Sequence, residues 1–368
     1  MDQVAIAFKN LNKVYFAVPV IALFLLALSW GQSLGTPVLL FLGFVLATAV
    51  YVAVSHAEVI AARVGEPFGS LILAVAVTII EVGMIVVLII ENPEATRNLA
   101  RDTVFAAIMI TTGAIVGGSI VIKSLRQKFS TFNPEGAVPA LAALASLSVV
   151  SLVLPSFTTS TPGPTFSHTQ LLFAASTSLI IYLLFVFMQT VRHRDFFLPP
   201  ARPSIPQGVN QHINSPSNTQ AIYSLAGLVA SLVAVVGLAK VTSPLIQSAV
   251  TTLGLPQMVV ALSIALVVLL PESISAFKAA TYGRTQTSIN LALGSALASI
   301  GMTIPAIAVV SIVFDFQVNL GLGSTDIVLL ILALFVSALT LIPGKASLLQ
   351  GAVHLSVFAA FVLVVFTP

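Results

Sequence analysis

Residues 68–90 read FGSLILAVAVTIIEVGMIVVLII, an apolar run of 23 residues with one charged side chain, Glu81, near its middle. A helix of this length crosses about 30 Å of hydrocarbon, so the run predicts a membrane helix. Similar apolar runs recur on both sides of it along the whole chain. The predicted fold class is therefore an all-α integral membrane protein.

The composition leads to the same fold class. Hydrophobic residues make up 58% of the 368 residues and charged residues only 7%, against about 25% charged in an ordinary soluble domain. So few charges cannot cover a soluble protein of this size, and most of the surface must face lipid. The chain has no cysteine, which excludes thiol nucleophiles, disulfides, zinc–thiolate sites and iron–sulfur clusters.

Eleven runs are long enough to form transmembrane helices. The first follows Lys9 and Lys13, but no small-residue cleavage site comes after it, so we expect a membrane helix rather than a signal peptide. A cytoplasmic N-terminus puts twelve Lys and Arg residues inside and only Arg97, Arg101 and Lys240 outside, as the positive-inside rule expects. The C-terminus then faces outside. The expected spans are residues 14–30, 37–54, 68–90, 104–122, 138–154, 169–189, 222–239, 257–278, 288–314, 327–342 and 347–366.

The longest break between spans is residues 193–220, HRDFFLPPARPSIPQGVNQHINSPSNTQ. It is rich in Pro, Ser, Asn and Gln and has no apolar period, which predicts a cytoplasmic linker over residues 191–221. Five spans lie on each side, in residues 36–190 and 222–368, after an N-terminal segment and leading helix in residues 1–35. An odd number of spans per block makes the second five-helix repeat inverted relative to the first. Such inverted repeats are typical of transporters.

Three carboxylates fall within the spans or at their ends: Glu58, Glu81 and Glu272. A charge at the centre of a membrane costs roughly 2.5 to 3.5 kcal/mol on insertion scales, so each acid needs a partner or a function. One alternative is a protonated glutamate that only bonds a neighbouring helix. Glu81 and Glu272, however, occupy the second span of each block, and inversion brings matching positions together at the bilayer midplane. We expect these two glutamates to be the metal ligands of one shared site for cations and protons.

Neutral oxygen atoms near the two acids are further candidate ligands. Pro271 has no N–H to donate to the carbonyl of Val267, which leaves that oxygen available to a hard cation. Thr78 and Ser273 add hydroxyl groups within a turn of the acids, although hydroxyls in membrane helices often bond back to their own backbone.

The span after each buried glutamate is rich in small residues, TTGAIVGGS at 111–119 and NLALGSALAS at 290–299. The simplest meaning of such spacing is close helix packing. Close packing also brings backbone carbonyls and short side chains within reach of a cation held between helices. The candidates in these spans are Gly113, Gly117, Gly294, Ser295 and Asn290.

These features resemble the cation/proton exchanger family of the calcium/cation antiporter superfamily. Three segments are similar to its bacterial Cha-type branch, whose members exchange calcium, sodium or potassium for protons. They are residues 55–83 (SHAEVIAARVGEPFGSLILAVAVTIIEVG), 269–280 (LLPESISAFKAA) and 289–305 (INLALGSALASIGMTIP). The resemblance covers essentially the whole chain and implies a leading helix with two inverted five-helix repeats, in a bacterial cell membrane.

The resemblance also implies roles for individual residues. Glu81 and Glu272 match the signature acids of the two repeats, and Glu58 is similar to an acid that serves cation and proton passage on the cytoplasmic side. Thr78 follows Val77 where the family usually has Gly-Asn, and Ser273 stands where many members have histidine. Gly118 and Ala114 stand where the family has an amide and a hydroxyl, and Ala298 stands where glutamine is usual. Fewer neutral oxygen ligands make sodium or potassium an alternative to calcium. The small-residue helices match at Gly113, Gly117, Gly294 and Ser295.

Three basic residues have open roles. Lys240 stands at the outer end of its helix where the repeat counterpart of Glu58 would be, and is either an ordinary interfacial lysine or a group that repels cations on the outer side. His56, beside Glu58, titrates in the range of a pH sensor, with a simply solvated histidine as the alternative. His354 is expected to be packed and hydrogen-bonded rather than a ligand.

We predict a secondary active antiporter that exports Ca²⁺, or alternatively Na⁺ or K⁺, in exchange for protons by alternating access. Burial penalises the charged form of each acid, so each glutamate would take either a proton or a cation. Expected partners are these ions and the lipid bilayer, without nucleic acid or any cofactor, and an oligomer is left open. A membrane-embedded enzyme is disfavoured because the chain has no HExxH motif and no nucleophile paired with the buried acids. A channel or a scaffold would not need matched acids in inverted halves.

Overall fold

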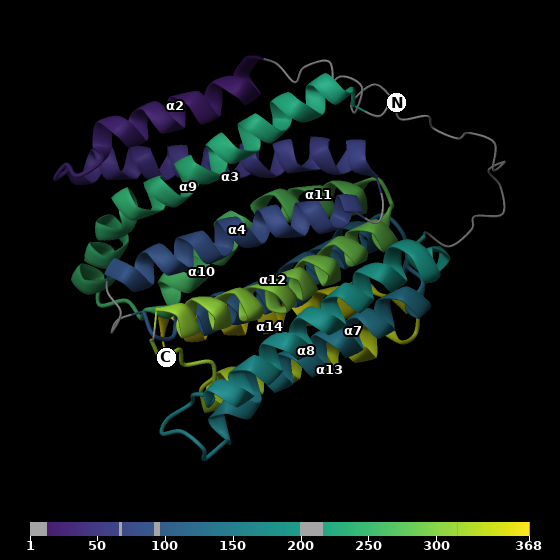
Figure 1. The fold of residues 1–368 in the computed structure, drawn as a ribbon. Coiled ribbons are helices and arrows are strands. Elements are labelled where there is room, and N and C mark those ends of the chain that lie inside the picture. Colours follow the sequence, from purple (N-terminus) through teal and green to yellow (C-terminus); the bar gives the residue numbers. More distant parts are fainter. Residues whose placement is uncertain (1–12, 66–67, 92–95, 199–215, 315, 368) are drawn as a thin grey trace. The chain divides into compact units, whose positions relative to one another are not determined.

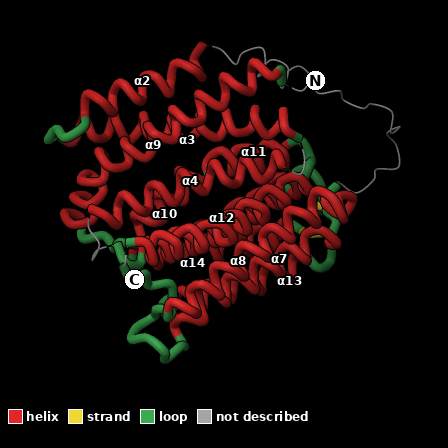
Figure 2. Tube along the Cα trace, in the orientation of Figure 1, coloured by secondary structure: helices red, strands yellow, loops and turns green. Residues whose placement is uncertain are grey.

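The computed structural model of the protein describes residues 13–65, 68–91, 96–198, 216–314 and 316–367, and most of them are helical (Figure 1, Figure 2). This confirms the all-α fold class. The α-helices are α2 (Lys13–Ser29), α3 (Thr36–Val64), α4 (Phe68–Glu91), α5 (Leu99–Met109), α6 (Val116–Ser124), α7 (Pro134–Ser148), α8 (His168–Phe187), α9 (Asn218–Leu253), α10 (Met258–Val268), α11 (Leu270–Thr281), α12 (Thr285–Val313), α13 (Ser324–Leu341) and α14 (Leu348–Phe366).

Short π-helical turns interrupt or end several helices. They are η1 (Ile110–Ile115), which joins α5 to α6, η2 (Val149–Val153) after α7 and η4 (Met188–Arg192) after α8. Two 3₁₀ turns, η3 (Leu154–Ser156) and η5 (Arg194–Phe197), follow η2 and η4.

Local sequence sets several helix ends. Ser167 and Gln170 form a capping box at the start of α8, where the Ser167 amide donates to the Gln170 Oε1 at 2.9 Å. Ser347 and Gln350 do the same at the start of α14, with 2.8 Å between the corresponding atoms. Gly65 ends α3 at a φ of 77°, a conformation that favours glycine.

The chain divides into two compact units. The first contains α2, α3, α4 and α9, and the second contains α5 to α8 and α10 to α14. Each unit therefore combines helices from both predicted five-helix blocks. The first two helices of the first block pack with the first helix of the second block, and the remaining helices of both blocks pack together.

In the first unit, α3 packs against α2, α4 and α9, and α9 also contacts α2 and α4. Small residues permit the close approach of these helices. A Cβ atom on Gly83 of α4 would lie 2.7 Å from the Val236 Cγ2 of α9, so α4 and α9 are in direct backbone-to-side-chain contact.

In the second unit, α5, η1 and α6 form one continuous helix, which is the most enclosed span. Of an apolar 18-residue stretch of this helix, 78% is buried, against 28–56% in the other candidate spans. It contacts α10, α11, α12, α13 and α14. The helix α12 packs beside it and also against α7 and α8. The glycine-rich segment of the sequence thus lies at the centre of this unit.

Among the described residues, nine helices are long and apolar enough to cross a membrane, and α10 with α11 makes a tenth span if the bent pair counts as one. Because α10 packs along α5 and α11 packs along α6, the pair follows the full length of one crossing helix. The remaining predicted span is α2, a shorter apolar helix. These elements correspond one for one to the eleven predicted spans, although the exact count stays a prediction.

Contacts between loops in the second unit agree with the predicted alternation of spans. The strand β1 (Ser130–Thr131) pairs antiparallel with β2 (Lys345–Ala346), and both belong to loops predicted inside. Thr165 forms an isolated antiparallel β-bridge with Asn319, and both residues belong to loops predicted on the outer side of the membrane. A single missed span between either pair would put the two loops on opposite faces, so the number of crossings between them is even.

Two helices are more than ten residues longer than predicted. α3 runs ten residues beyond the expected end at residue 54, to Val64, and α9 has 36 residues, which corresponds to about 54 Å. The expectation that Lys240 lies at the end of its helix is wrong, because α9 continues through Pro244 to Leu253. A proline inside a helix removes only one backbone donor, and apolar residues beyond it still favour a membrane helix. Most of the predicted linker, residues 199–215, lies outside the described residues.

Candidate cation-binding site

The helix α4 carries Glu81 in the first unit. Glu81 lies near the middle of this 24-residue helix and is 2% exposed. Thr78, one turn earlier on the same face, is also buried. Both side chains therefore lie where a cation would be stripped of bulk water.

The helix that carries Glu272 is broken. α10 ends at Val268, α11 begins at Leu270, and the two halves meet at an angle of 57°. Pro271 lies in the first turn of α11 and gives no N–H to the carbonyl of Val267. The break therefore follows from the proline that the sequence places before the glutamate.

Glu272 lies in the first turn of α11 and is half-buried. The N-terminal end of a helix carries partial positive charge, which attracts anionic groups. Ser273 uses its hydroxyl to donate a hydrogen bond of 2.7 Å to the carbonyl of Leu269, the residue at the break. The hydroxyl oxygen of Ser273 still has lone pairs that can accept a further hydrogen bond.

The two acids belong to different units, Glu81 to the first and Glu272 to the second. That they share one site stays a prediction. Within each unit, the described residues include no group of three or more Asp, Glu or His side chains that could hold a metal ion.

Gly113 and Gly117 face α14. A Cβ atom on Gly113 would lie 2.8 Å from the Phe358 Cβ, and one on Gly117 would lie 2.7 Å from the His354 Cβ. Their neighbour Gly118 faces another helix, since its Cβ would lie 2.7 Å from the Phe277 ring of α11. The glycine-rich helix therefore packs closely on two sides, and one of those sides is the half-helix that begins near Glu272.

The candidates on α12 differ from one another. No described atom lies within 4 Å of a Cβ built on Gly294, and Ser295 beside it is half-buried. Gly294 therefore borders open space rather than a packed neighbour. Asn290 donates from Nδ2 to the carbonyl of Phe197 at 2.7 Å and accepts from Gln286 Nε2 at 2.9 Å, so its amide holds the start of the linker region against α12.

His56 is fully buried, and the solvated alternative for it is wrong. Its Nε2 lies 3.2 Å from the carbonyl of Tyr15 in α2. That carbonyl has no regular helical donor, because the residue four positions on is Pro19. Gly227 of α9 leaves room for the imidazole ring, since a Cβ there would lie 2.5 Å from Nε2. Glu58, two residues after His56 in α3, is exposed.

Lys240 is exposed, and its Nζ lies 5.0 Å from the centre of the Trp30 ring at the end of α2. Tryptophan and lysine are both common at membrane interfaces, and a cation above an aromatic face is attracted to it. This contact favours the interfacial-lysine interpretation over repulsion of a cation in the transport path.

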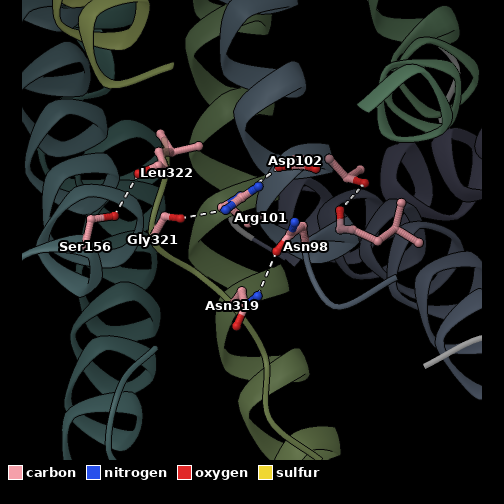
Figure 3. A network of polar contacts seen from close by, with 9 residues as sticks. Asn98, Arg101, Asp102, Ser156, Asn319, Gly321 and Leu322 are labelled. Carbon is pink, nitrogen blue, oxygen red and sulfur yellow. Dashed lines mark hydrogen bonds and ion pairs between the residues drawn. The ribbon is translucent and has the colours of Figure 1, made fainter. Parts of the chain in front are cut away.

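A polar network at the start of α5 was not predicted from the sequence (Figure 3). Arg101 donates from Nε to the Asp102 carboxylate at 2.7 Å and from Nη1 to the carbonyl of Gly321 at 2.7 Å. Asn319 donates to the Oδ1 of Asn98 at 2.9 Å. These bonds tie the loop before α13 to the first turn of α5. The charged pair at 101 and 102 was visible in the sequence, but its partner carbonyl lies 220 residues away.

The profile of the sodium/calcium exchanger protein family matches residues 34–191 and 223–367. The chain belongs to this family. Both matched segments end within two residues of the predicted blocks 36–190 and 222–368. The match confirms the resemblance stated from the sequence. Members of this family are transporters, so the protein is a multi-pass membrane transporter and not an enzyme.

Two relatives extend over most of the chain. A putative ionic transporter, y4hA of Sinorhizobium fredii, is 45% identical over 320 residues, which are 87% of this chain and 86% of the relative. The sodium-potassium/proton antiporter ChaA of Escherichia coli (strain K12) is 31% identical over 354 residues, which are 95% of this chain and 94% of the relative.

Two solved structures share the fold. YfkE in its native form superposes with a TM-score of 0.69 at 17% identity, over 98% of this chain and all of the other. The crystal structure of the H⁺/Ca²⁺ exchanger CAX superposes with a TM-score of 0.68 at 16% identity, over 95% of this chain and 87% of the other.

Proposed function

We propose that the protein is an antiporter that moves an inorganic cation against protons, with Glu81 and Glu272 each binding either species. The observation that carries the proposal is the position of Glu272, in the first turn of a half-helix that starts at a proline break. Glu272 directly follows Pro271, and Pro271 deprives the carbonyl of Val267 of its regular helical donor. Such discontinuous helices form ion sites in other transporters.

The competition between proton and cation follows from burial. A carboxylate inside the membrane is stabilised either by taking up a proton or by binding a cation, and the two states exclude each other. If each site faces one side of the membrane at a time, uptake of one species requires release of the other, and exchange results.

The cargo that we favour is Na⁺ or K⁺, with Ca²⁺ as the second candidate. ChaA, which is 31% identical over nearly the whole chain, is a sodium-potassium/proton antiporter. Ca²⁺ takes six to eight oxygen ligands, whereas Ala114, Gly118 and Ala298 have no side-chain oxygen at positions where the family usually has a hydroxyl, an amide and a glutamine. This ranking of the transported cations differs from the expectation from the sequence, which put calcium first. The sodium/calcium exchanger profile keeps calcium in the comparison.

Proton flux in proteoliposomes tests this proposal. Vesicles with an acidic lumen and a pH dye inside receive NaCl, KCl or CaCl₂ in turn. We expect Na⁺ or K⁺ to drive the fastest alkalinisation of the lumen. A lumen that stays acidic with all three cations would overturn antiport.

Variants of the acids test the site. Glu81→Gln and Glu272→Gln should each abolish exchange, because an amide remains polar but cannot trade a proton for a cation. Glu58→Gln should reduce exchange without abolishing it. Glu135→Gln is the matched control, because Glu135 also lies in the first turn of a helix, α7, but is exposed. Wild-type exchange in Glu81→Gln or Glu272→Gln would remove that residue from the site.

A further inference from the structure

The π-helical turn η1 changes the backbone bonds of the glycine-rich helix. In a regular α-helix the Val116 N–H would donate to the carbonyl of Thr112. Here it donates to the carbonyls of Thr111 and Gly113 instead. The Thr112 carbonyl thus loses its regular donor in the most enclosed span of the second unit.

His354 of α14 supplies a replacement. Its Nδ1 lies 2.7 Å from the Thr112 carbonyl oxygen, and its Nε2 lies 3.1 Å from the Thr340 hydroxyl of α13. A carbonyl only accepts, so the ring hydrogen is on Nδ1, and in the neutral ring Nε2 accepts from Thr340. At 1% exposure, the imidazole joins three helices and has both nitrogens bonded.

Glycines make room for this contact. A Cβ on Gly117 would lie 2.7 Å from the His354 Cβ and 3.0 Å from the carbonyl oxygen of Gly351. A Cβ on Gly351 would in turn lie 3.0 Å from the carbonyl oxygen of Gly117. The two backbones therefore meet at paired glycines one turn from the histidine, which is why the imidazole reaches the Thr112 carbonyl.

The π turn also sets which residues of α6 face which neighbour. One extra residue rotates all later side chains by about 100° around the helix axis. After the turn, Gly118 faces the Phe277 ring of α11, and the Ser119 Oγ lies 2.6 Å from the Ser288 Oγ of α12. Phe277 belongs to the same half-helix as Glu272.

We propose that His354 is a positioning residue for the cation site. By holding the Thr112 carbonyl it keeps the π turn, and the π turn fixes the rotation at which α6 packs against α11 and α12. The half-helix that carries Glu272 is placed through this contact. The link from His354 to helix rotation stands on geometry alone, and only its consequence for transport rests on the proposed function.

Two substitutions separate this role from simple filling of space. In His354→Asn the side-chain amide N–H takes the place of Nδ1–H, so the bond to Thr112 is kept. In His354→Gln the amide takes the place of Nε2 and the bond to Thr112 is lost. Both variants are polar and neutral, so a difference between them reports the carbonyl contact.

The extent of disulfide cross-linking measures the helix rotation independently of transport activity. The chain has no cysteine, so Ser119→Cys with Ser288→Cys introduces a single pair at positions whose hydroxyl oxygens are 2.6 Å apart. Mild oxidation should cross-link this pair to the same extent with His354 or Asn at 354, and at least about threefold less with Gln, because a disulfide tolerates little change in geometry. Equal cross-linking in the Asn and Gln backgrounds would overturn the role in rotation.

Exchange in proteoliposomes reports the role in positioning. His354→Asn should keep the KM for the cation within about twofold of wild type, and His354→Gln should raise it about tenfold, the effect of one lost buried hydrogen bond. Equal KM values for the two variants, whether both normal or both raised, would overturn the assignment. Failure of the wild type to exchange any cation would instead overturn the proposed function, while the cross-link still tests the rotation.

Discussion

At the scale of the residue, two glycines of the predicted site have opposite surroundings. A Cβ on Gly117 would overlap α14, whereas one on Gly294 meets no described atom within 4 Å. Gly117→Ala should therefore destabilise the protein by about 1–3 kcal/mol through overpacking. Gly294→Ala should be neutral or stabilising by up to about 1 kcal/mol, since alanine is the better helix former.

Thermal unfolding of the two variants in the same detergent measures this difference. Exchange assays add a second comparison, because the open space beside Gly294 lies next to Ser295, a candidate ligand. A lower Tm for Gly294→Ala than for Gly117→Ala would contradict the packing seen here.

Arg101 and Asp102 form a largely buried ion pair, with side-chain exposures of 12% and 7%. Removing one partner leaves an uncompensated charge, which typically costs about 3–5 kcal/mol, whereas removing both costs less. Asp102→Asn and Arg101→Gln should thus each lower the free energy of unfolding more than the double variant does. Chemical unfolding of all four proteins gives the coupling energy. Additive losses would show that the two charges act independently.

At the scale of the element, the break between α10 and α11 depends on Pro271. Pro271→Ala restores an N–H that can donate to the Val267 carbonyl, so the two halves should approach one straight helix. We expect an equal or higher Tm and a loss of exchange, because Glu272 would leave the helix N-terminus.

Pro305→Ala is the matched control for this variant, because Pro305 lies inside α12, which continues past it to Val313 without a break. It should retain exchange. Normal exchange in Pro271→Ala would mean that the break is not needed for the site.

At the scale of the whole molecule, the predicted topology puts the two ends of α14 on opposite sides of the membrane. Thr367→Cys should react with an impermeant thiol reagent applied outside intact cells, since the C-terminus is predicted outside. Lys345→Cys, just before the same helix and equally exposed, should react only after the cells are made permeable. Protection of the cysteine at 367 would mean that the span count or the orientation is wrong.

Hydropathy and proline breaks are local properties of the chain, so the membrane class, the segments that become helices and the acids within them could all be predicted from the sequence. The sequence also indicated the family. The contacts that those segments make with one another depend on how the helices pack. Only packing buries His56 against Gly227, brings Arg101 to the Gly321 carbonyl and sets His354 on the π turn. Such contacts join residues far apart in the chain, and no local pattern encodes the rotation at which two apolar helices meet.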